Sequence, residues 1–75
     1  MAFFESGQFY RHRSFLDVDM YVVGVADIVP LDDKGAVQYN LNIMWTLQRN
    51  HDAMIAPELV KVKSEDICNW KLVRA

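Results

Sequence analysis

The chain has 75 residues, a formal net charge of −2 and 52% hydrophobic residues. A chain this short predicts a single domain over residues 1–75, because two hydrophobic cores do not fit within it. The acidic balance argues against a general binder of nucleic acid, since attraction to phosphate depends on accumulated positive charge.

Cys68 is the only cysteine in the chain, so no internal disulfide can form and a reducing, cytoplasmic setting fits best. We expect no membrane segment, because no apolar run approaches the roughly 18 residues that a membrane helix needs. Small domains usually need a further source of stability, and self-association is the one that remains here. We therefore expect a homo-oligomer.

Two strands are predicted in the first half of the chain. Residues 8–13 alternate imperfectly and predict a short strand with Tyr10 and His12 on one side. Residues 15–29 predict a longer strand, which Gly24 interrupts at a bulge or sharp bend. Its first half has an apolar face and a more polar face; these are Leu16, Val18, Met20 and Val22, against Asp17, Asp19 and Tyr21.

The central strand, residues 36–49, carries the longest alternation in the chain. The sequence Asp-Asp-Lys-Gly before it is typical of a hairpin loop, with Gly35 suited to a left-handed backbone. Residues 15–29 and 36–49 are therefore predicted to form a long antiparallel hairpin.

Shorter elements follow the central strand. Residues 49–52 predict a turn, residues 59–63 an edge strand with outward lysines, and residues 64–69 a single 3₁₀ turn. Residues 70–74 close the chain as a last short strand. This arrangement predicts an all-β fold, a small five-stranded SH3-like barrel with one 3₁₀ turn before the last strand; an OB-like barrel is the alternative.

The cluster Tyr10, Arg11, His12 and Arg13 is the first candidate binding site. Aromatic rings interleaved with guanidinium groups can stack on bases and bind phosphates. They can also contact a protein partner, or the two arginines can form exposed ion pairs with Asp17 and Asp19 on the next strand. We favour the ion pairs and treat nucleic acid as the less favoured partner.

The second candidate site lies on the central strand, whose polar face carries amides and a hydroxyl but no charge. Such a face suits a wet interface with an identical subunit or another protein, although ordinary solvent exposure is equally compatible. Its members are Gln38, Asn40, Asn42, Thr46 and Gln48. Tyr39, Trp45 and Trp70 could instead line an aromatic groove, but we favour core packing of these rings, least clearly for Trp70.

Catalytic, metal and cofactor sites are not expected. The two histidines and Cys68 show none of the spacings typical of metal sites or nucleophiles, and we expect Cys68 to be buried and His51 to be solvated. Asp32 and Asp33 are explained by turn chemistry, since two carboxylates fall far short of a calcium loop.

Three segments together suggest a family: GQFYRHRSFLDVDMYVV near the start, IMW in the central strand and VKVKSEDICNWKLV near the end. The chain resembles small proteins encoded by tailed bacteriophages, including those of marine cyanobacteria. The resemblance implies a compact β-barrel in the host cytoplasm and carries over no functional residue. Our expectation is a non-enzymatic barrel that acts through protein contacts or self-assembly, with a small nucleic-acid-binding barrel as the alternative.

Overall fold

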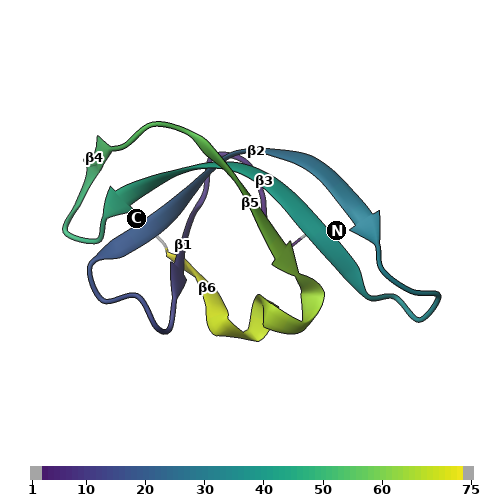
Figure 1. Cartoon of the computed structure of the whole chain (residues 1–75). Helices are drawn as coiled ribbons and strands as arrows, with labels where there is room; N and C mark the ends of the chain where they lie inside the picture. Colours follow the sequence, from purple (N-terminus) through teal and green to yellow (C-terminus); the bar gives the residue numbers. More distant parts are fainter. Residues whose placement is uncertain (1–2, 74–75) are drawn as a thin grey trace.

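A computed structural model describes residues 3–73 and shows six strands and one 3₁₀ turn (Figure 1). The all-β prediction and the 3₁₀ turn before the last strand are confirmed. The elements are β1 (Phe9–His12), β2 (Val18–Pro30), β3 (Val37–Leu47), β4 (Asn50–Met54), β5 (Glu58–Lys63), η1 (Ser64–Asn69) and β6 (Trp70–Val73).

All strand pairs are antiparallel and belong to one curved sheet. The order β5-β3-β2-β1-β6, with η1 joining the two outer strands, is the arrangement expected of an SH3-like barrel. The structure has six strands rather than five because the turn predicted at residues 49–52 is tighter than expected. Asn50 already pairs with Leu47, so residues 50–54 form the separate strand β4 beside the end of β3.

The hairpin of β2 and β3 is the longest pairing in the molecule, running from Val18 opposite Leu47 to Pro30 opposite Val37. Its register shifts at two bulges in β2, between Val22 and Gly24 and again between Val25 and Asp27. The bulge predicted at Gly24 is therefore confirmed, and a bulge bends the strand that carries it. Beyond these bends, the end of the hairpin projects to the right of Figure 1, while β5 stays paired with β3 as far as Gln38.

The core lies on the concave face of the sheet and follows the predicted alternation. Met20 and Val22 of β2 are fully buried there, together with alternate residues of β3. Phe4, from the segment before β1, is also fully buried and packs edge-on against Tyr10 and Tyr39. The buried apolar side chains are Phe4, Tyr10, Met20, Val22, Tyr39, Leu41, Ile43 and Val62.

The molecule measures 40 × 21 × 18 Å, and its long axis runs roughly along the β2–β3 hairpin. The hairpin loop lies at one end of this axis, while the turn between β1 and β2 lies toward the other (Figure 1). Within residues 3–73, no helix has the length and hydrophobicity to cross a membrane.

Candidate functional site

A groove of about 410 Å³ lies where the β1–β2 turn meets η1 and β6. This volume falls in the range of about 300–1,000 Å³ that is usual for ligand pockets. We call it the aromatic–basic groove, after six of the residues that line it: His12, Arg13, Phe15, Leu16, Trp70 and Lys71.

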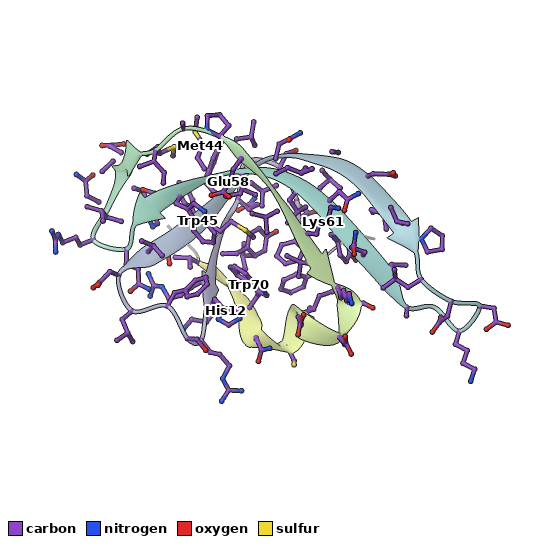
Figure 2. All side chains as sticks on the ribbon, viewed as in Figure 1. His12, Met44, Trp45, Glu58, Lys61 and Trp70 are labelled. Atoms are coloured by element: carbon purple, nitrogen blue, oxygen red, sulfur yellow. The ribbon has the colours of Figure 1, made fainter. Side chains whose placement is uncertain are left out.

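Three rings form a connected cluster in the groove. The centroid of His12 lies 4.7 Å from that of Phe15 and 4.8 Å from that of Trp70, and Phe15 and Trp70 are 6.0 Å apart in an edge-on arrangement. His12 and Trp70 come from directly opposed positions of β1 and β6, so both side chains lie on the same face of the sheet. Figure 2 shows them on that face, with Trp45 above them.

The β1–β2 turn that carries the groove is held by a local hydrogen bond and by bonds to η1 and to Gln48. The Arg13 amide donates to the Asn69 carbonyl at 2.9 Å, and the Ser14 amide donates to Nδ1 of His12 at 3.0 Å. From the turn after β3, Nε2 of Gln48 donates to the carbonyls of Phe15 and Val18, at 3.0 and 3.2 Å. These bonds fix the turn, so the rings and Arg13 are positioned before any ligand arrives.

The residues that line the groove include three basic side chains and no carboxylate. Arg11 is occupied by Asp19, whereas Arg13 and Lys71 are exposed and form no ion pair with any acid in residues 3–73. Phe15 and Leu16 are also exposed, Leu16 to 85%. The groove therefore offers apolar surface beside positive charge.

A second hollow of about 310 Å³ adjoins the groove on the side of β5 and shares His12, Phe15 and Trp70 with it. Trp45 lines this hollow and packs edge-on against Phe15, with ring centroids 5.6 Å apart. Its indole Nε1 donates to a carboxylate oxygen of Glu58 at 2.6 Å, and Figure 2 shows these two side chains next to each other. This hollow is lined by one basic and one acidic side chain, Lys61 and Asp66, whose formal charges cancel.

The opposite face of β1 and β2 carries a cluster around a buried carboxylate. Asp19 is fully buried and accepts two hydrogen bonds from Arg11, from Nε at 2.7 Å and from Nη2 at 3.0 Å. Nε2 of His51, from β4, lies 2.8 Å from the second carboxylate oxygen of Asp19. The His51 ring stacks on Phe9 with centroids 4.0 Å apart and planes only 9° from parallel.

This cluster determines the protonation of Asp19. Burial would raise the pKa of the carboxyl, but the hydrogen bonds and charges of Arg11 and His51 outweigh burial and hold the pKa of Asp19 below its usual value. The hydrogen bond to Asp19 in turn raises the pKa of the Arg11 guanidinium. The carboxylate is thus ionised and fully paired at neutral pH.

The structure separates the four residues of the predicted Tyr10–Arg13 cluster. Tyr10 is 1% exposed and belongs to the core, which corrects its place among the partner-binding candidates, because a side chain covered by Phe4 cannot contact a partner. Arg11 forms the predicted pair with Asp19, but the Asp19 side chain is fully buried, whereas that of Arg11 is 31% exposed. Arg11, His12 and Arg13 all line the groove, but the guanidinium of Arg11 is held by Asp19.

The uncharged polar face of β3 is largely occupied within the chain. Thr46 is buried and donates to the carbonyl of Asn50, and Gln48 binds the β1–β2 turn. Gln38 donates to Asn40 and both are half-buried, which leaves Asn42 as the exposed amide of the predicted set.

The two tryptophans are half-buried and line hollows, while Tyr39 belongs to the core. The sequence pattern places Phe15 and Leu16 inside a strand and does not indicate them as groove residues, whereas they lie in the turn before β2. The sequence predicts a solvated His51 and a buried Cys68. His51 instead contacts Asp19, and Cys68 is exposed in η1.

Residues 3–73 contain no group of three or more His, Cys, Asp and Glu side chains that could hold a metal ion. Comparison with protein-family models, curated proteins and solved structures gave no match to this chain. The geometry of the groove is therefore the basis for a functional assignment.

Proposed function

We propose that this chain is a non-enzymatic protein-interaction module whose aromatic–basic groove holds an acidic, apolar segment of another polypeptide chain. The observation that carries the proposal is the composition of the groove. Its floor consists of aromatic rings in contact with one another, and every charged residue lining it is basic. The resemblance to tailed-phage proteins suggests the setting in which such a module would act.

The floor favours a polypeptide with a branched or aromatic side chain. Rings that are only half-covered gain free energy when apolar surface is placed on them, by about 25 cal/mol per Å² removed from water. Phe15 and Leu16 are the most accessible parts of this surface, and Leu16 extends into solvent beside Arg13. An aliphatic side chain of the partner can cover both.

The rim favours a carboxylate next to that apolar side chain. The guanidinium of Arg13 is free of ion pairs within the described residues and can bind a carboxylate through two hydrogen bonds. Because the turn that carries Arg13 is fixed by the bonds to Asn69 and Gln48, less conformational entropy is lost on binding.

Nucleic acid is the alternative ligand, because rings and basic residues also suit single-stranded nucleic acid. Two residues on which that hypothesis depended are engaged elsewhere, Tyr10 in the core and Arg11 with Asp19. The chain as a whole is also acidic, with a net charge of −2. These observations favour a polypeptide.

A selection experiment tests the proposed function. A library of random twelve-residue peptides displayed on phage is selected on the immobilised full chain, and we expect enrichment of aliphatic residues adjacent to Asp or Glu. The Arg13→Glu variant should bind the enriched peptide at least about tenfold more weakly. Lys63→Glu, which makes the same change of charge on β5 outside the groove, should bind it as the unaltered chain does.

The same samples are then titrated at low salt with a twelve-nucleotide single-stranded DNA and with the corresponding RNA. The proposal fails if no peptide is enriched, if Arg13→Glu binds the peptide as tightly as the unaltered chain, or if the oligonucleotides bind more tightly than the peptide. In the last case the groove is a nucleic-acid site.

A further inference from the structure

The loop of the β2–β3 hairpin has the composition that the groove requires. Residues 31–35 follow the exposed end of β2 and read Leu-Asp-Asp-Lys-Gly, so an aliphatic side chain directly precedes two carboxylates. Leu31 is 46% exposed and Ile28, in the same hairpin, is 41% exposed. Asp33 is exposed and forms no ion pair with a described residue.

The loop is also rigid, which lowers the conformational entropy lost on docking. One carboxylate oxygen of Asp32 accepts the amides of Lys34 and Ala36, at 2.8 and 3.1 Å, and the Leu31 amide donates to the Ala36 carbonyl at 2.8 Å. Gly35 takes a φ of 99°, which a residue with a side chain rarely adopts. Leu31 and Asp33 are thus displayed in a fixed arrangement.

A molecule cannot place this loop in its own groove. The loop lies at one end of the 40 Å long axis, and the groove lies on the far side of the body, around the β1–β2 turn and β6 (Figure 1). The sheet between them is continuous, and β2 and β3 are paired along their whole length. Only the loop of another copy can reach the groove.

We propose that the hairpin loop of one copy docks into the aromatic–basic groove of a second copy, with Leu31 on Phe15 and Trp70 and Asp33 at Arg13. This inference rests on the proposed function and names the partner as an identical chain. The loop surface is acidic and the lining of the groove is basic, so their charges are complementary. The contact is head to tail, because the two surfaces that meet are different.

The strength of the contact follows from its size. A single loop in a groove of about 410 Å³ forms an interface below the standard size for stable complexes. We therefore expect a dissociation constant of about 10–500 µM rather than a nanomolar complex. Sedimentation equilibrium of the full chain over that concentration range should show a mass that rises above the monomer and falls back when salt is added.

Two variants disrupt the two halves of the contact separately. Arg13→Glu alters the groove, and the double variant Leu31→Ser/Asp33→Lys alters the loop while leaving Asp32 and its turn hydrogen bonds in place. Each should be monomeric where the unaltered chain associates, with self-association weakened at least about tenfold. Glu65→Lys, which makes the acid-to-lysine change at an exposed position of η1, should associate as the unaltered chain does.

The decisive measurement is a mixture of the two defective variants. Each retains the half that the other has lost, so an equimolar mixture should form a one-to-one dimer that neither variant forms alone. Far-UV circular dichroism of each variant checks that the fold is retained. A dimer in the mixture supports the inference.

Three outcomes overturn the inference: a strict monomer of the unaltered chain at 500 µM, association that is unchanged in both variants, or no dimer in the mixture. If the selected acidic peptide still binds in an Arg13-dependent way, the groove is a polypeptide site and only its partner has been misassigned. If the peptide also fails, the proposed function fails with the inference.

Discussion

Arg11 and Arg13 stand two residues apart in the sequence, but they meet very different surroundings. Arg11 is paired with the buried carboxylate of Asp19. Arg13 lies just beyond the end of β1, in a turn that leaves its guanidinium exposed at a groove. Within one short run of basic and aromatic residues, Arg11 is therefore engaged in the fold, while Arg13 stays available at the surface.

The two surroundings also differ in how polar atoms are satisfied. Around Asp19, Arg11 and His51 supply three short contacts to the two carboxylate oxygens, so the cluster has no free carboxylate oxygen for a ligand. In the groove, the hydrogen bonds are made by the backbone of the turn, and the side chains of Arg13 and Phe15 remain open. The first arrangement holds three strands together, while the second presents a surface.

The largest expected effect is a loss of stability on replacing Arg11. Arg11→Gln leaves the buried Asp19 carboxylate with His51 alone, and we expect the free energy of unfolding to fall by about 3 kcal/mol. The matched variant Arg13→Gln should change it by less than about 0.5 kcal/mol, because this side chain is exposed. Urea unfolding at pH 7 measures both. Equal losses of unfolding free energy in the two variants would show that Arg11 stabilises the fold no more than Arg13 does.

The next effect is a dependence of stability on acid. The pKa of Asp19 is lowered in the folded protein, so the unfolded chain takes up this proton first as the pH falls. The stabilisation by Asp19 is therefore complete above the usual carboxyl pKa of about 3.9 and is lost as the pH drops through the lower folded value.

Urea unfolding of the unaltered chain and of Asp19→Asn at pH 7, 5, 4 and 3 measures this contribution. The two free energies of unfolding should differ clearly at pH 7 and converge below pH 4. Asp17→Asn, an exposed acid two residues earlier, serves as the control and should follow the unaltered chain. A difference that stays constant to pH 3 would show that the charge of Asp19 does not stabilise the fold.

The smallest expected effect on stability concerns Tyr10, whose side chain is buried in the core. Its phenol donates to the Phe3 carbonyl at 3.0 Å and accepts the Glu5 amide at 2.8 Å. Tyr10→Phe should lower the free energy of unfolding by about 1 kcal/mol, while Tyr39→Phe on β3 should change it less. Thermal unfolding followed by circular dichroism can resolve this difference.

Tyr10 also makes stability depend on pH in the alkaline range. Burial raises the pKa of its phenol, so the folded protein favours the neutral ring and this stabilisation is lost as the pH rises through the raised value. If Tyr10→Phe loses stability above pH 10 as steeply as the unaltered chain, then Tyr10 is not the group that titrates.

The strands were predictable because their signal is local. A period of two places Met20 and Val22 on one face regardless of the rest of the chain, and the loop residues of the β2–β3 hairpin fix its turn. The serine and two acids that begin η1 mark a turn in the same local way.

The candidate sites were less predictable because they depend on residues that are distant in sequence. Nothing near Asp19 indicates that His51, 32 positions later, will cover it, since this contact depends on β4 forming a strand. The groove likewise needs Trp70 brought beside His12 by the pairing of β1 with β6. The signal for Phe15 and Leu16 was present, since Ser14 before them is a turn residue that ends the strand pattern.

The two bulges in β2 have a consequence for any assembly of this chain. They bend the hairpin between the body, which carries the groove, and the end of the hairpin, which carries the loop. In a head-to-tail series, that bend fixes the rotation from each copy to the next. If a whole number of these rotations makes one full turn, the series closes into a ring. Any other rotation leaves an open filament. In such a series, the bend at Gly24 and Asp27 would therefore decide between a ring and a filament.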